Sequence, residues 1–178
     1  SWKLGDTFRS NPVTVGTPSA WFKDARDSAG AFASFRVANV RSTANGKRIV
    51  VAGSNDGQLH AFRTDTGAES WSFIPPNVLS KLKDIAHKSH PTGLTHQYFV
   101  DGPISVADVW LGTGDGTVKS AADWKTLMVF GEGRGGTSTL WSSSSSCDAN
   151  FQNVYSATYP YYCGYHALDI TNTTSPAY

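Results

Sequence analysis

The sequence predicts an all-β fold with a minor helical part, arranged as part of a β-propeller. Glycine is frequent, aromatic residues make up 12% of the chain and only 16% of residues are charged, a composition typical of β-rich, turn-rich proteins. Short apolar runs alternate with turns that contain Gly, Asp or Asn. Two of the resulting strand–turn–strand units resemble each other, as expected of a repeat.

The expected strands follow one another along the chain, separated by turn residues. They are predicted at residues 12–15, 48–55, 57–67 and 68–76, at two places within 96–112 on either side of Asp101–Gly102–Pro103, at 124–133 and at 164–171. Leu59 and Ala61 alternate with His60 and Phe62, which is the period-two pattern of a strand. The strand at 68–76 ends in two prolines, which cannot extend a hydrogen-bonded ladder.

Two segments have helical character. Within 20–40, the first half is expected to be helical because its apolar residues follow a 3.6-residue period loosely. The clearer helix covers 77–89, with its core near 78–87 and Asn77 as its N-cap. Its apolar face consists of Val78, Leu79, Leu82, Ile85 and Ala86.

The repeat consists of an apolar strand, a glycine turn, a second strand and another turn. The stretch "LHAF" at 59–62 and the stretch "YHAL" at 165–168 occupy the same place in their units. Propeller blades of one well-known class run about 40 to 45 residues, so we expect about three to four blades in this chain. A ring needs at least about four blades to close. Residues 1–178 are therefore expected to form a partial propeller.

An insertion rich in serine and tyrosine, residues 136–163, interrupts the second unit and is expected to be a surface loop. Its two cysteines are Cys147 and Cys163. Neither belongs to a C-x-x-C motif, which excludes a thioredoxin-like site and covalent haem attachment. In an oxidising compartment we expect them to form a disulfide that contributes about 3 kcal/mol. Two free thiols are the alternative.

Aromatic side chains crowd the same insertion. Such side chains offer a large contact area at low entropic cost, as at binding surfaces. One interpretation is that the loop presents a binding surface, and the other is that it folds back and covers an open blade. The residues concerned are Phe151, Tyr155, Tyr159, Tyr161 and Tyr162.

Several stretches resemble one known family. "GSNDGQLHAFRTDTGAESWSFIPP", "HQYFVDGPISVADVW", "WKTLMVFGEGRGG" and "GYHALDIT" occur in the order found in the C-terminal propeller of the PilC/PilY proteins of bacterial type IV pili. The resemblance covers most of residues 3–133 and resumes at 164–176. It implies the N-terminal part of a modified quinoprotein-like propeller. Family members are secreted through the periplasm, lie at the outer membrane or pilus tip, support pilus extension and in several cases mediate adhesion.

The stretch "AFRTDTGAESW" resembles the repeat of quinoprotein dehydrogenases, in which Thr-Gly and Trp residues dock neighbouring blades. The resemblance implies this role for Thr66, Gly67 and Trp71. Asn55–Asp56–Gly57 is expected to turn the chain between two strands. The family's aspartate-rich calcium loop is not found in this sequence, so we expect no metal and no other cofactor here.

Catalytic motifs are incomplete. Gly131, Gly133 and Gly136 spell G-x-G-x-x-G, but poor helix formers follow them, and a dinucleotide site needs a helix N-terminus there. The histidines of "HKSHPTGLTH" have no nearby cysteine and are expected to be loop residues, not zinc ligands. No nucleophile-elbow pattern G-x-S-x-G is present. We therefore expect no enzymatic activity.

Charge and hydropathy narrow the possible partners. The net charge of +1 gives no electrostatic basis for nucleic-acid binding. No apolar run is long enough to span a bilayer, and the N-terminal residues lack the pattern of a signal peptide.

The expected function is that of a non-enzymatic extracellular binding or scaffold module of a pilus tip or pilus-assembly protein. Minor pilins or a completing chain of the same propeller are the expected partners, and a host or surface receptor is a further one. The alternatives are a subunit of an extracellular filament and a fragment of a quinoprotein-type oxidoreductase.

Overall fold

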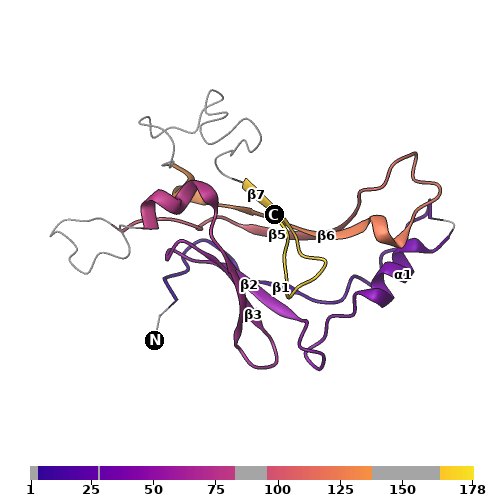
Figure 1. Cartoon of the computed structure of the whole chain (residues 1–178), viewed down its shortest axis with the longest axis horizontal. Helices are drawn as coiled ribbons and strands as arrows, with labels where there is room; N and C mark the ends of the chain where they lie inside the picture. Colours follow the sequence, from indigo (N-terminus) through magenta and orange to yellow (C-terminus); the bar gives the residue numbers. More distant parts are fainter. Residues whose placement is uncertain (1–3, 28, 83–95, 138–164) are drawn as a thin grey trace.

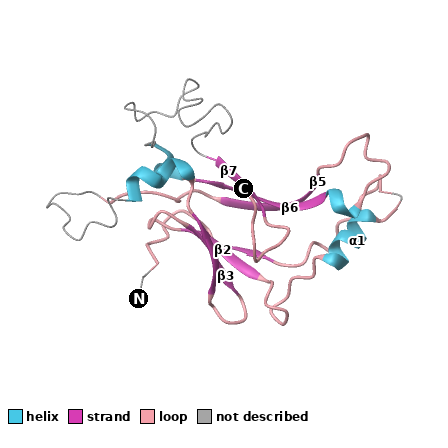
Figure 2. Cartoon of the chain, viewed as in Figure 1, coloured by secondary structure: helices cyan, strands magenta, loops and turns pink. Residues whose placement is uncertain are grey.

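Two antiparallel sheets make up most of the computed structural model, which describes residues 4–27, 29–82, 96–137 and 165–178 (Figure 1). The first sheet has the strand order β1 (Val13–Val15), β2 (Ile49–Gly53), β3 (Leu59–Arg63) and β4 (Glu69–Phe73). The second has the order β5 (Ile104–Trp110), β6 (Trp124–Gly131) and β7 (Tyr165–Asp169). The prediction of a mainly β fold with little helix is confirmed, as Figure 2 shows.

Each sheet is an up-and-down meander, the form of a propeller blade. After β7 the chain turns back, and Asp169 and Ala177 exchange backbone hydrogen bonds of 2.8 and 2.9 Å at the position of a fourth strand. The described residues thus contain two blades, fewer than the three to four expected from length. Long connections between β1 and β2 and between β6 and β7 raise the number of residues in each blade.

The core lies between the two sheets. Alternate residues of β2 and β3, such as Val51 and Ala61, are fully buried against alternate residues of β6 and β7, such as Met128 and Leu168. This period-two pattern gives each sheet one face toward the other. The complete cluster comprises Val15, Ile49, Val51, Leu59, Ala61, Val100, Ile104, Met128, Phe130, Leu168 and Ile170.

The α-helix α1 (Ala31–Ala38) lies in the second half of the segment 20–40, so the expectation of a helix in its first half is wrong. Asp27 Oδ2 accepts a hydrogen bond of 3.0 Å from the Phe32 N–H, which ties the loop before the helix to its first turn. Phe32 and Phe35 are buried, whereas Trp21 is 94% exposed. The helix forms in the second half because Phe32 and Phe35 pack there against Trp124, and this tertiary packing outweighs the weak helical periodicity of the first half.

The segment 96–103 is not a strand, although one was expected before Asp101. Instead, the N–H groups of Asp101 and Gly102 donate to the carbonyls of Glu132 and Gly131 at 3.1 and 3.0 Å. A Cβ on Gly102 would lie 2.4 Å from the Gly131 oxygen. Close backbone packing therefore requires glycine at position 102. Within the glycine motif, Gly133 has a φ of 56°, and a Cβ there would lie 3.1 Å from the Asp101 carbonyl oxygen.

The helix expected at 77–89 lies mostly outside the described residues. Its first part is a 3-10 helix, η1 (Pro76–Lys81), with Pro75 at the N-cap position. Asn77 is inside this helix and does not cap it. The Asn77 side chain is buried and donates from Nδ2 to Glu132 Oε2 at 2.8 Å, so a long-range partner replaces the local one.

Candidate functional site

The predicted disulfide and aromatic binding surface lie outside the described residues, as do two of the three clustered histidines. These predictions stay open for Cys147, Cys163, Phe151, Tyr155, Tyr159, Tyr161, Tyr162, His87 and His90. The third histidine, His96, pairs with Asp6, at 2.9 Å from Nε2 to Oδ1.

Asn55, Asp56 and Gly57 lie in the turn between β2 and β3, where Gly57 has a φ of 98°. Thr66 and Gly67 form the exposed turn between β3 and β4. There the Thr66 hydroxyl accepts the Ala68 N–H at 3.2 Å, a contact within the turn. A blade-docking role for Thr66 and Gly67 stays a prediction.

A buried histidine, His60 in β3, lies between two carboxylates just after the β2–β3 turn. His60 Nε2 lies 3.0 Å from both oxygens of Asp56, and Nδ1 lies 2.7 Å from Glu69 Oε1. The His60 and Asp56 side chains are each 5% exposed, and that of Glu69 is 47% exposed. Only the doubly protonated imidazole can donate to both carboxylates, so the geometry favours the imidazolium.

The pKa values of this cluster follow from its geometry. Burial by itself lowers the pKa of His60, but the hydrogen bonds to Asp56 and Glu69 outweigh it and raise the pKa above its ordinary 6.5. Burial opposes ionisation of Asp56, yet the bonds from His60 and the Gly5 N–H hold the pKa of Asp56 below 3.8. The charged pair joins the N-terminal segment, the turn and β3.

We predict a specific pH dependence of stability for this cluster. The raised pKa means that the stabilisation by His60 is complete below pH 6.5 and is lost as pH rises through the folded-state pKa. The lowered pKa of Asp56 gives stabilisation that is complete above pH 3.8 and is lost as pH falls through its folded-state value. Urea unfolding from pH 5 to 9 should therefore show an alkaline loss of stability that His60→Gln reduces. An unchanged alkaline slope in His60→Gln contradicts the assignment.

The second blade holds an equivalent pair. His166 Nε2 lies 2.7 Å from Glu132 Oε1, and Glu132 is fully buried just after β6. His60 pairs across the sheet with Ala52, and His166 pairs with Phe130, so the two histidines occupy the same register position. Neither Glu132 nor His166 was identified as a site residue from the sequence. The shared histidine of "LHAF" and "YHAL" was the available signal.

Three residues join the two sheets through hydrogen bonds. Trp71 Nε1 donates to the Thr173 carbonyl at 2.8 Å, and the Thr173 hydroxyl donates to the Lys47 carbonyl at 2.7 Å. The turn after β7 is thus bound to the first sheet. A docking role for Trp71 remains a prediction, and this contact is its structural basis.

Arg41 is the third joining residue and was not identified from the sequence. It is 4% exposed and lies before β2. Nη1 donates to the Gly16 carbonyl at 3.1 Å, while Nη2 donates to Thr126 Oγ1 at 2.7 Å and the Thr171 carbonyl at 3.1 Å. One guanidinium therefore connects the start of the first blade to β6 and to the turn after β7.

The two sheets pack with unlike faces. The pair Val51–Ala61 corresponds in register to Val129–Ala167. We call the face that carries these residues the front face of each blade, and the opposite face, which carries Ala52 and His60 or Phe130 and His166, the back face. The front face of the first blade and the back face of the second form the core.

The front face of the second blade has no sheet packed on it within the described residues. Val51 and Leu59 are fully buried on the first front face. Their counterparts on the second, Val129 and Tyr165, are 42% and 72% exposed. The front face of the second blade is therefore exposed to solvent in the described residues, although the equivalent face of the first blade is buried.

In the described ranges, no group of three or more His, Cys, Asp or Glu side chains is placed to hold a metal ion. No helix there has the length and apolar character needed to cross a bilayer.

Comparison with known proteins agrees with this architecture. Residues 4–158 match the family model described as the PilY1 beta-propeller domain. The type IV pilus biogenesis factor PilY1 homolog of Xylella fastidiosa (strain Temecula1) is 32% identical over 133 residues, which cover 75% of this chain and 10% of that protein. The type IV pilus biogenesis factor PilY1 of Pseudomonas aeruginosa (strain UCBPP-PA14) is 32% identical over 169 residues, which cover 86% of this chain and 13% of that protein.

The chain thus spans about a tenth of the length of these relatives. No solved structure matches it significantly. The two blades, the repeat and the long family match agree, and the resemblance to the pilus proteins is confirmed. The chain belongs to the PilY1 β-propeller family.

Proposed function

We propose that the chain is a non-enzymatic binding or scaffold module in type IV pilus biogenesis, located at the cell surface or pilus tip and acting through protein–protein contacts. The relatives are named pilus biogenesis factors, and a pilus requires its parts to bind one another. The observation that carries the proposal is the open front face of the second blade. Its residues repeat, position for position, a face that is buried in the first blade.

The partner on this face is proposed to be a sheet that presents a back face, supplied by a completing part of the same propeller. A minor pilin is the proposed partner of the assembled module, with no bound cofactor required. The aliphatic character of Leu127 and Val129 suits sheet-on-sheet packing.

The test is Val129→Asp in the full-length protein, expressed in its own bacterium. A carboxylate on the open front face cannot be buried without a large desolvation cost. We expect several-fold fewer surface pili at an unchanged protein level, measured by electron microscopy and immunoblot. The matched control is Val118→Asp, because Val118 is 76% exposed in the β5–β6 connection.

Wild-type piliation in Val129→Asp would falsify the proposed use of this face. A quinone bound in stoichiometric amount, detected by absorption and mass spectrometry, would contradict the non-enzymatic assignment.

A further inference from the structure

A second apolar cluster lies apart from the sheet core. The connection between β1 and β2, which contains α1, meets the connection between β5 and β6 at one end of the molecule (Figure 1). Phe32 and Phe35 of α1 pack there with Trp124, and Trp110 packs against them. The two connections thus build a small core of their own, beyond what blade packing requires.

The loop that precedes α1 is fixed to this core. The Phe22 ring lies edge-on to Phe32, with centroids 4.8 Å apart, and Phe32 lies 4.7 Å from Trp124. Lys119 forms an ion pair with Asp24. The ammonium group of Lys119 also lies 4.9 Å from the centroid of Trp110, within cation–π range. Aromatic and ionic contacts therefore hold the segment 19–24 in place beside the helix.

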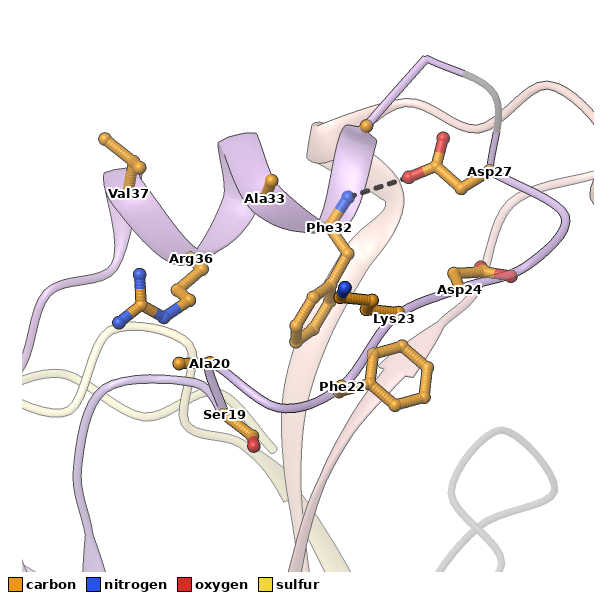
Figure 3. Close-up of a pocket in the computed structure, with 11 residues that line it drawn as sticks. Ser19, Ala20, Phe22, Lys23, Asp24, Asp27, Phe32, Ala33, Arg36 and Val37 are labelled. Atoms are coloured by element: carbon orange, nitrogen blue, oxygen red, sulfur yellow. Dashed lines mark hydrogen bonds between the residues drawn. The ribbon is translucent and has the colours of Figure 1, made fainter.

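A pocket of about 360 Å³ opens between that segment and α1. Ala20, Phe22, Phe32, Ala33 and Val37 supply its apolar lining. Figure 3 shows the Phe32 ring pointing into this space from the helix, with the Lys23 side chain beside it. The volume is near the lower limit of about 300 Å³ for ligand pockets, and it suits one or two side chains.

The rim of the pocket has an excess of positive charge. Lys119 neutralises Asp24, and Asp27 Oδ2 accepts the Phe32 N–H. Across the described ranges, Lys23 and Arg36, which line the pocket, form no ion pair, so the charged groups Lys23, Arg36, Lys119, Asp24 and Asp27 carry a net charge of +1. An apolar pocket beside uncompensated cations is complementary to an apolar side chain flanked by carboxylates.

Exposed apolar side chains extend the surface around the opening. Trp21 is 94% exposed and Val37 is 70% exposed. Large exposed aromatic residues beside a formed pocket are typical of protein-binding surfaces. A partner polypeptide, which can cover both the pocket and its surroundings, fits this site better than a small metabolite.

We propose that this pocket binds an acidic segment of a partner polypeptide. One aromatic or aliphatic side chain of the segment enters between Phe32 and Val37, and its flanking carboxylates pair with Lys23 and Arg36. The inference rests on the proposed binding function, but it uses a surface different from the front face of the second blade. A failure at the pocket and a failure of the front-face proposal are therefore distinguishable.

The experiment is an NMR titration of the isotope-labelled chain with two synthetic pentapeptides, acetyl-Glu-Asp-Phe-Asp-Glu-amide and its basic counterpart acetyl-Lys-Arg-Phe-Arg-Lys-amide. The acidic peptide should shift the amide signals of residues 19–24 and 31–37, with a dissociation constant of about 1 mM or lower. The basic peptide should leave them unchanged. Lys23→Glu combined with Arg36→Glu should weaken acidic-peptide binding by about tenfold or more, from the loss of two pairs and the added repulsion.

The matched control is Lys47→Glu combined with Arg48→Glu, which changes the net charge equally at two exposed residues and should preserve binding. A dispersed spectrum checks the fold of each variant. Equal binding of both peptides, shifts confined to other residues, or no shift at several millimolar contradicts the proposal. Concentration-dependent broadening of the same signals without peptide would identify a second copy as the occupant and overturn the assignment of an acidic segment.

Discussion

Glu132→Ala is expected to lower the free energy of unfolding by about 3 kcal/mol, because each buried polar group left without its partner costs about 1–3 kcal/mol. The carboxylate is fully buried and has two partners. It accepts from Asn77 Nδ2 at 2.8 Å and lies 2.7 Å from His166 Nε2. The alanine variant leaves both partners buried without their acceptor.

Urea unfolding at neutral pH measures this loss. Glu132→Gln should cost less, since its amide oxygen can still accept the hydrogen bond from Asn77. Asp115→Ala is the control, because Asp115 is exposed in the β5–β6 connection, and a change within about 0.5 kcal/mol is expected there. Equal stabilities of Glu132→Ala and the control would show that the buried network contributes nothing.

Arg41→Met is expected to cost about 3 kcal/mol, since removing a buried charged partner leaves its acceptors unpaired. The residue donates to Thr126 and to the Thr171 carbonyl, and Thr126 in turn donates to Asp108 at 2.7 Å. Burial lowers the pKa of Arg41, while Asp108 and Asp169 oppose that effect. The substitution removes the cation and leaves these carboxylates without it.

Denaturant unfolding followed by tryptophan fluorescence tests this second expectation. Arg41→Lys should recover little stability, because a single ammonium group cannot reproduce the forked geometry of the guanidinium. The control is Arg48→Ala, an exposed arginine just before β2. A loss in Arg41→Met no larger than in this control would mean that Arg41 does not join the sheets energetically.

The strands could be predicted from sequence because their information is local. The alternation of Leu59 and Ala61 with His60 and Phe62 sets two faces whatever packs on them. The structure has a strand in every segment that was predicted to be one, except the segment before Asp101. That segment forms backbone hydrogen bonds with Gly131 and Glu132, some thirty residues later.

The candidate sites depend on contacts between residues that are far apart in the sequence, and local sequence patterns do not predict such contacts. Arg41 resembles Arg48 in the sequence, yet one is buried at the sheet junction and the other is exposed. The α1 pocket depends on packing between Phe32 and Trp124, which come from different blades. The two histidines are the exception, because the repeat itself aligns His60 with His166, whereas the fold alone brings Glu132 to His166.

The packing of an unlike front and back face gives the two-blade unit a direction. Two copies related by a twofold axis would bring identical faces together, because a twofold interface uses the same patch on both partners. Here each interface needs two different patches, so every added blade repeats the same rotation and presents the same kind of surface as the one before. Blades packed in this way can be added in one direction only. The series ends when the rotations between successive blades add up to a full turn and form a closed ring.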